Sequence, residues 1–167
     1  MNTTTMSDVG RTNFMQRLDR EVARVMELSS VEKVRILIVE YDEGCRNAFK
    51  TIFKDSRLSR CAVEFAESVN EAMALIATRV FDLLVLDYKL ADGTAADLVR
   101  QWRQFGYEVP FVCVSGDETR DEEMQQLGAL NFISRECASE PSALERVIRY
   151  ALHNYWKATA SGFCQQN

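Results

Sequence analysis

The sequence contains little histidine, and its cysteines form no recognisable pairs. The only histidine in 167 residues, His153, excludes multi-histidine metal chemistry and leaves little room for a Ser-His-Asp or Cys-His nucleophile. The five cysteines are odd in number, scattered and never spaced as CxxC, which argues against a disulfide framework and a zinc site. Such cysteine usage is typical of a reducing compartment, so we expect a cytoplasmic protein.

Long apolar runs and an excess of basic residues are also missing. No apolar stretch reaches the roughly 18 residues of a membrane span, and the polar start MNTTTMSDVG lacks the regions of a signal peptide. The 20 basic and 25 acidic side chains give a net charge of −5. This balance disfavours sequence-independent binding to nucleic-acid phosphates. We therefore expect neither a membrane nor a nucleic acid as partner.

Length and composition fit one globular domain with a short extension. A chain of 167 residues, 47% of them apolar, can bury about 70% of its unfolded surface and needs no disulfide or metal to hold a core. We expect an N-terminal extension over 1–32, a domain over 33–157 and a flexible tail over 158–167. No further domain is expected after the tail.

The extension is predicted to contain an amphipathic helix from Thr12 to about Ser29. Its apolar side chains recur at helical spacing: Phe14, Leu18, Val22, Val25 and Met26. This apolar stripe has three open partners: its own domain, the same helix of a second chain, or a groove on another protein. Pairing between two copies would make a homodimer through residues 12–29.

The rest of the chain alternates between two periodicities. Short unbroken apolar runs, such as the one within Arg35–Val39, are typical of strands covered on both faces, and hence of a parallel sheet. Strands are predicted near 35–39, 61–66, 81–86, 111–114 and 131–134, and helices around 48–53, 69–76, 98–102, 119–127 and 141–157. This alternation predicts an α/β fold with a doubly wound five-stranded parallel sheet, flavodoxin-like with strand order 2-1-3-4-5.

Ligands of such sheets bind beyond the carboxyl ends of the strands, where the strand order reverses. The predicted strands end in Glu40-Tyr41-Asp42-Glu43, in Asp87, in Ser115-Gly116 and in Ser134-Arg135. Two acids, a hydroxyl and a cation at converging strand ends suit a divalent cation and a phosphoryl group. Polar strand ends that merely reach solvent are the alternative for any one of these residues.

The segments that carry these residues resemble a known family, the receiver domain of bacterial two-component response regulators. The likeness lies in ILIVE at 36–40, FDLLVLDYKLADG at 81–93, VPFVCVSGD at 109–117 and GALNFISRE at 128–136. It covers about Val34 to Lys157. The resemblance implies that a kinase phosphohistidine donates a phosphoryl group to the chain, and that magnesium and a cationic side chain offset the crowded negative charge.

The resemblance assigns roles to individual residues. Asp87 is the expected phosphoacceptor, Ser115 the hydroxyl that moves toward the phosphoryl oxygen, and Arg135 the cation. Phe132 stands at the place of the aromatic side chain that swings inward on activation, although plain core packing explains it equally well. Arg135 replaces the usual lysine of the family and is followed by Glu136 instead of proline, so the relay to the surface is expected to differ.

The expected metal site consists of Glu40, Asp87 and the backbone carbonyl of Lys89. Tyr41 replaces a second acid that ligates the metal in the family, and a phenol is a poor magnesium ligand. Asp42 is expected to compensate if the turn lets it reach in, because alternate residues of an extended chain share a face. We therefore expect a weakened Mg²⁺ site.

Two residues are predicted to flank the mouth of the site as a gate. Lys89 lies two residues past the acceptor and Asp117 two residues past the hydroxyl. An exposed ion pair between them would add under about 1 kcal/mol to stability, but it would hinder the in-line approach of water to a phosphoryl group.

Three functions remain open on these residues. The first is a response regulator that is phosphorylated by a sensor histidine kinase or phosphotransfer protein and acts on a downstream protein target. The second is a pseudo-receiver, which keeps the fold and signals without phosphate, as Tyr41 suggests. A flavin or nucleotide enzyme on the same sheet is disfavoured, because the acidic Glu40–Glu43 segment would repel phosphate.

Overall fold

The computed structural model describes residues 33–55, 57–138 and 140–163. The predicted helix over 12–29, and any pairing through it, lie outside this range. The strands are β1 (Arg35–Val39), β2 (Ala62–Ala66), β3 (Leu83–Asp87), β4 (Lys89–Leu90), β5 (Gly93–Thr94), β6 (Phe111–Ser115) and β7 (Asn131–Ser134). The helices are α2 (Glu43–Asp55), α3 (Val69–Thr78), α4 (Ala95–Gln104), α5 (Asp121–Gln126), α6 (Arg135–Ala138) and α7 (Pro141–Phe163), with 3₁₀ turns η1 (Arg57–Arg60) and η2 (Glu118–Arg120).

The five long strands form one parallel sheet in the order β2-β1-β3-β6-β7. This confirms the predicted doubly wound sheet, since β6 and β7 are its fourth and fifth strands. The register brings the carboxyl ends together, with Val39 opposite Leu86, Asp87 opposite Val114, and Ser115 opposite Ser134. The polar residues that follow these strands therefore gather at one edge of the sheet.

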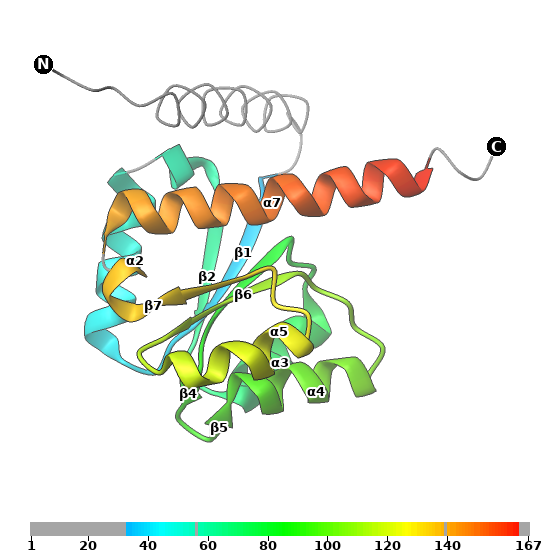
Figure 1. Ribbon diagram of the computed structural model, residues 1–167, viewed down its shortest axis with the longest axis horizontal. Coiled ribbons are helices and arrows are strands. Elements are labelled where there is room, and N and C mark those ends of the chain that lie inside the picture. Colours follow the sequence, from blue (N-terminus) through cyan, green and yellow to red (C-terminus); the bar gives the residue numbers. More distant parts are fainter. Residues whose placement is uncertain (1–32, 56, 139, 164–167) are drawn as a thin grey trace, which may run out of the picture.

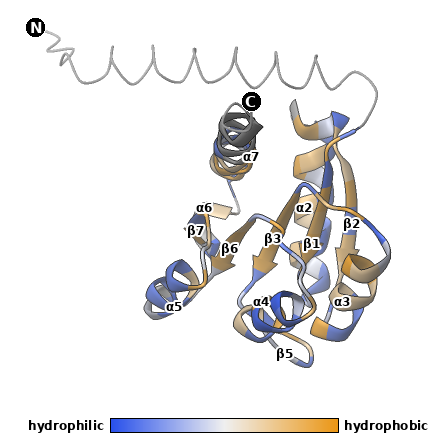
Figure 2. Ribbon diagram, turned by 90° about the vertical axis from the view of Figure 1, so that its right-hand side faces the viewer, coloured by the Kyte–Doolittle hydropathy of each residue, from blue (hydrophilic) through white to orange (hydrophobic). Residues whose placement is uncertain are grey.

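Helices cover both faces of the sheet (Figure 1), with α2 and α7 on one side and α3, α4 and α5 on the other. Figure 2 shows the apolar strands enclosed between these layers, while α4 and α5 turn hydrophilic faces outward. The core under α4 includes Trp102 packed edge to face on Phe111, with ring centroids 5.5 Å apart. The opposite core joins α2 to α7, through residues such as Phe49 and Ile148.

Local sequence signals explain the start of two helices. The Ser68 hydroxyl caps α3 by accepting a hydrogen bond from the Glu71 N–H. Thr94 and Asp97 form a capping box at the start of α4, each side chain accepting from the other's backbone N–H. Gly106 adopts a φ of 78° just after α4, a conformation that glycine reaches without strain.

The elements differ from the prediction in several places, including the short helix α6 and the turn η1, which were not predicted. The region predicted as one helix over 119–127 begins with the 3₁₀ turn η2, and α5 starts only at Asp121. Strands β4 and β5 form a short antiparallel hairpin that the sequence pattern does not reveal. Helix α7 continues to Phe163, past the predicted end near Lys157, because 158–160 contains no helix breaker. Residues 158–163 of the predicted flexible tail are therefore helical.

No helix in the described part of the chain has the length and apolar character needed to cross a membrane.

Candidate phosphoryl site at the carboxyl edge of the sheet

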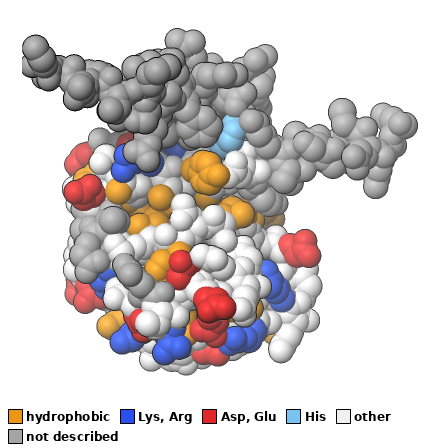
Figure 3. All heavy atoms as spheres, in the orientation of Figure 1, with side chains coloured by type: hydrophobic (Ala, Val, Ile, Leu, Met, Phe, Trp, Pro, Cys, Tyr) orange, Lys and Arg blue, Asp and Glu red, His pale blue; other side chains and the backbone are white. Residues whose placement is uncertain are grey.

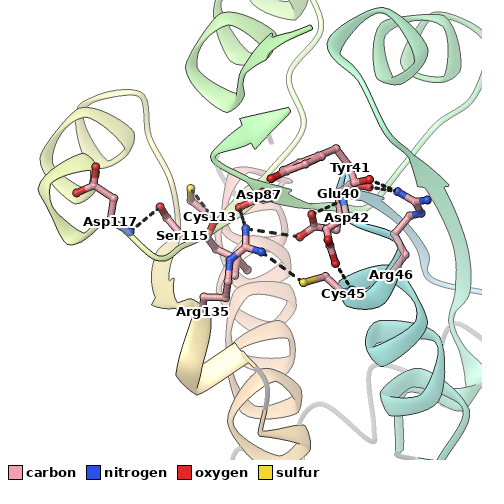
Figure 4. A network of polar contacts seen from close by, with 11 residues as sticks. Glu40, Tyr41, Asp42, Cys45, Arg46, Asp87, Cys113, Ser115, Asp117 and Arg135 are labelled. Atoms are coloured by element: carbon pink, nitrogen blue, oxygen red, sulfur yellow. Dashed lines mark hydrogen bonds and ion pairs between the residues drawn. The ribbon is translucent and has the colours of Figure 1, made fainter. Parts of the chain in front are cut away.

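The carboxyl edge of the sheet brings together two acids and one arginine from three strand ends. Glu40 follows β1, Asp87 ends β3 and Arg135 begins α6 directly after β7. The Arg135 Nη2 atom lies 2.6 Å from Asp87 Oδ1 and 3.9 Å from Glu40 Oε2 (Figure 4). The cluster predicted from the sequence thus exists, with one guanidinium facing both carboxylates.

Asp87, like Glu40, is almost completely buried. Its residue exposure is 3%, and its Oδ2 atom is buried without a hydrogen-bond partner among the described residues. Burial raises the pKa of the Asp87 carboxyl, and the hydrogen bond and charge of Arg135 counteract that rise. A buried carboxylate with one oxygen held by arginine and the other free can act as a nucleophile or as a ligand.

Glu40 is held by the backbone of its own loop. Its Oε1 accepts a hydrogen bond from the Asp42 N–H at 2.9 Å, and the residue is only 2% exposed. Burial raises the pKa of Glu40, while the Asp42 N–H lowers it and the charge of Asp87 raises it further. Two buried acids that disfavour each other's ionisation make this edge a suitable place for cations.

Asp42 and Tyr41 do not complete a third carboxylate position. Asp42 precedes α2, and its Oδ1 accepts a hydrogen bond from the Cys45 N–H at 2.8 Å, so the side chain caps the helix. This bond lowers the pKa of Asp42. The Tyr41 residue is 46% exposed. In the described part of the chain no group of three histidine, cysteine or acidic side chains is arranged to hold a metal ion.

The donor set therefore fits magnesium only in part. The buried Glu40 and Asp87 carboxylates, with the free Oδ2 of Asp87, are the oxygen ligands that Mg²⁺ prefers. Lys89 begins β4 two residues past Asp87, where its backbone carbonyl is the third candidate. A third carboxylate is not contributed by Tyr41 or by Asp42, which caps α2, so the weakened site expected from Tyr41 stays a prediction.

Arg46 is a site residue that the sequence reasoning missed. From the first turn of α2 its Nη1 donates to the carbonyls of Glu40, at 2.9 Å, and Tyr41, at 2.6 Å, and its Nη2 pairs with Glu67 at 2.8 Å. Its side chain is 12% exposed. The only sequence signal is an arginine six residues after an acidic strand end, and that pattern is common on solvated helices.

Ser115 and Asp117 lie on the other side of Asp87. The Ser115 side chain is buried, and its Oγ accepts from the Asp117 N–H at 3.0 Å. The Asp117 carboxylate accepts from the Thr119 hydroxyl and N–H and lies 3.5 Å from Arg120 Nε. These Thr119 hydrogen bonds lower the pKa of Asp117. The predicted Lys89–Asp117 ion pair is not formed among the described residues, because Asp117 turns to its own loop.

A second missed group connects the residue after Asp87 to α5. Tyr88 is buried, and its hydroxyl donates to Glu123 Oε2 at 2.7 Å. Arg100 of α4 donates to the other Glu123 oxygen at 2.9 Å, and the Arg120 guanidinium lies 5.3 Å from the centroid of the Tyr88 ring. Hydrogen bonds from Tyr88 and Arg100 lower the pKa of Glu123. On the lower part of Figure 3, near α4 and α5, acidic and basic side chains are intermixed.

Phe132, the expected switch, is partly buried on β7. It packs against the core that lies under α3 and α4, opposite Cys113 in the sheet register. This position serves a core residue and a movable aromatic equally well, so its switching role stays a prediction.

Comparison with known proteins identifies relatives of one kind. Residues 36–148 match the family model described as the response regulator receiver domain. The KDP operon transcriptional regulatory protein KdpE of Escherichia coli (strain K12) is 30% identical over 128 residues, which are 75% of this chain and 54% of that protein. The alginate biosynthesis transcriptional regulatory protein AlgB of Pseudomonas aeruginosa is 28% identical over 69% of this chain and 25% of its own length. The chain thus spans about half, or less, of these relatives.

Solved structures of receiver domains have a similar fold. The HemR receiver domain of Leptospira biflexa, in its non-phosphorylated form, is 33% identical with a TM-score of 0.58, covering 70% of this chain and 94% of that one. A CheY-like receiver domain protein of Methanospirillum hungatei JF-1 is 24% identical with a TM-score of 0.67, covering 76% of this chain and 99% of that one. The second likeness shows the fold alone.

Proposed function

Because this chain belongs to the response regulator receiver domain family, we propose that it accepts a phosphoryl group on Asp87 from the phosphohistidine of a sensor kinase or phosphotransfer protein. Receiver domains are signalling phosphoacceptors and generally not enzymes. The observation that carries the proposal is the buried Oδ2 of Asp87, which has no hydrogen-bond partner in the described structure and lies beside a bound guanidinium. The output is a contact with a downstream protein.

The chemistry needs an ionised Asp87 and charge stabilisation around it. An Asp87 oxygen forms a bond to phosphorus while the phosphorus–nitrogen bond of the phosphohistidine breaks, and the histidine nitrogen leaves with the electron pair. The product is an acyl phosphate. Arg135 offsets the added negative charge. Ser115 donates its hydroxyl to a phosphoryl oxygen once it releases the Asp117 N–H.

Receiver domains generally bind Mg²⁺ at the phosphorylation site. In this chain Glu40, Asp87 and the backbone carbonyl of Lys89 would hold the ion, which would supply charge neutralisation to the transferred group. Because Tyr41 is exposed and Asp42 caps α2, we propose a site of low affinity.

The response to the phosphoryl group involves the other predicted residues. Movement of Ser115 would draw the loop before α5 inward and leave space for Phe132 to follow. Lys89 and Asp117 flank the mouth of the site. They would slow the attack of water on the phosphoryl group if Asp117 left its ion pair with Arg120 and paired with Lys89 instead.

A phosphorylation-independent pseudo-receiver is the second candidate. It is favoured by the exposed phenol at Tyr41 and by the use of Asp42 as a helix cap. In that case the same fold would act as an interaction module without phosphate.

Intact mass spectrometry after incubation with a small phosphodonor and magnesium separates the two candidates. The wild type should gain one phosphoryl group, and Asp87→Asn should gain none. Asp55→Asn, an exposed acid at the end of α2, is the matched control and should be modified like the wild type. A wild type that stays unmodified at high magnesium, with a kinase as well as with the small donor, would establish the pseudo-receiver.

A further inference from the structure

Arg135 occupies the position from which a cation can neutralise both buried acids. Its Nη2 is 2.6 Å from Asp87 Oδ1 and 3.9 Å from Glu40 Oε2, and its Nη1 donates to Cys45 Sγ at 3.3 Å (Figure 4). The guanidinium therefore contacts β3, the end of β1 and the first turn of α2 at once. It connects the last strand of the sheet to the elements that carry the candidate metal ligands.

The two carboxylates need a positive charge close by. Glu40 and Asp87 are 2% and 3% exposed, and a buried carboxylate without a compensating partner is strongly unfavourable. Arg135 supplies this charge from within the chain. The acidic cluster is therefore compatible with the folded state before any metal ion binds.

A divalent cation that bridges Glu40 and Asp87 needs the place where the guanidinium now contacts both carboxylates. Magnesium contacts its oxygen ligands directly, at about 2.0–2.1 Å. Of the Asp87 oxygens, Oδ1 is held by Arg135 and only Oδ2 is free in the described structure. A phosphoryl group on one oxygen leaves the other for the metal, so metal and phosphoryl together require the oxygen that Arg135 now holds.

The identity of the cation makes it hard to displace. A lysine would present one compact charge, whereas the planar guanidinium makes several directed contacts at a time and stays charged at every physiological pH. We propose that Arg135 is the resident counter-cation of the Glu40–Asp87 pair, and that a divalent cation binds there only as the guanidinium withdraws. The proposal rests on the metal ligands named under the proposed function and adds that Arg135 sets their affinity.

Manganese binding to the full chain tests this competition without any phosphate chemistry. Mn²⁺ is the probe, and loss of the free aquo-ion signal in electron paramagnetic resonance reports binding. Arg135→Ala should bind Mn²⁺ more tightly than the wild type by on the order of tenfold, which corresponds to about 1.4 kcal/mol. Arg135→Lys, which keeps the charge but not the fork, should lie between the two. Asp87→Asn should weaken Mn²⁺ binding, because it removes one of the two carboxylates that form the proposed site.

Arg120→Ala is the matched control. Arg120 lies on the same edge of the sheet in the loop before α5, is 48% exposed and pairs with Asp117, not with the two buried acids. Its loss should change the affinity less than about twofold, as expected for an exposed charge. Equal tightening in Arg120→Ala and Arg135→Ala would show that long-range repulsion between arginine and Mn²⁺ sets the affinity, and would overturn the competition.

Unchanged or weaker binding in Arg135→Ala would also overturn it. If that variant does not fold, Arg135→Lys decides, since it must still bind Mn²⁺ more tightly than the wild type. No phosphodonor is present, so a negative result leaves Asp87 as the proposed phosphoacceptor. Conversely, an unmodified wild type in the mass spectrometry leaves the competition intact.

Discussion

The two loops that flank Asp87 use their polar groups differently. In the loop between β1 and α2, Arg46 binds two carbonyls and Asp42 caps the following helix, so the polar groups are engaged in holding the loop itself. In the loop between β6 and α5, the contacts run outward from Ser115 through Asp117 to Arg120, and from there to Tyr88. The first loop is therefore fixed to the start of α2, the helix that follows it, whereas the contacts of the second loop lead to Tyr88, the residue after the acceptor.

This difference indicates where a phosphoryl signal can leave the site. The Arg46 contacts lie under a side chain that is only 12% exposed, whereas the Asp117–Arg120 pair is about half exposed and worth under about 1 kcal/mol. Rearranging the loop before α5 is therefore the less unfavourable change. We expect the β1–α2 side to stay in place and the α5 side to respond.

Removing Arg46 should have the largest effect on stability. Arg46→Ala leaves the carbonyls of Glu40 and Tyr41 without their charged donor, so the free energy of unfolding should fall by about 2 kcal/mol, in the range of hydrogen bonds to charged groups. Urea unfolding followed by circular dichroism measures it. Arg79→Ala is the control, because the side chain of this 46% exposed arginine pairs with Glu64 alone among the described residues, and its loss should cost under about 1 kcal/mol. Equal losses would mean that the first loop is not specially fixed.

Tyr88→Phe should have a smaller effect on stability, confined to the loop between β6 and α5 and to α5 itself. The change removes the hydroxyl that donates to Glu123 and should lower the free energy of unfolding by about 1 kcal/mol. Amide hydrogen exchange should become faster in α5. Tyr107→Phe serves for comparison, since no hydrogen bond of that hydroxyl is formed within the described residues. Unaltered exchange in α5 would show that Tyr88 does not hold this helix.

Glu123→Gln should give the smallest effect, and one that depends on pH. Hydrogen bonds lower the pKa of Glu123 in the folded protein, so its stabilisation is present above the ordinary glutamate pKa of about 4.3 and is lost as the pH falls through the folded value. Near pH 7 the wild type should exceed Glu123→Gln by under about 1 kcal/mol.

Thermal unfolding between neutral and acid pH checks this sign. The difference in stability between the wild type and Glu123→Gln should shrink as the pH falls below the ordinary pKa of glutamate. Glu122→Gln, on the same helix with only a 3.4 Å contact to Gln126, should show little difference at any pH. A stability difference between the wild type and Glu123→Gln that grows toward acid pH would contradict the account.

The sequence reveals the sheet because buried parallel strands leave a strong local pattern. The run Ile36–Val39 and the segment before Asp87 are unbroken and apolar, and the polar residues that follow them fall at one edge because the strands are parallel. Glu40, Asp87 and Arg135 could therefore be placed together without coordinates.

The finer contacts leave no such pattern. Whether Asp42 points toward the expected metal site or caps α2 depends on the geometry of the turn. The side chain caps α2 because it satisfies an otherwise free backbone N–H at the start of the helix. The pairing of Tyr88 with Glu123 joins residues 35 positions apart through helix packing. Asp117 pairs with Arg120, three positions further along the chain, and the spacing of strand ends does not reveal this local pairing.

Hydrogen–deuterium exchange of the phosphorylated protein tests the central comparison most directly. The wild type and Asp87→Asn are treated identically with phosphodonor and magnesium, and exchange is measured peptide by peptide. We predict altered exchange over 115–126 in the wild type alone, with 40–46 nearly unchanged. A wild type that carries the phosphoryl group on Asp87 and changes only over 40–46 would contradict the account.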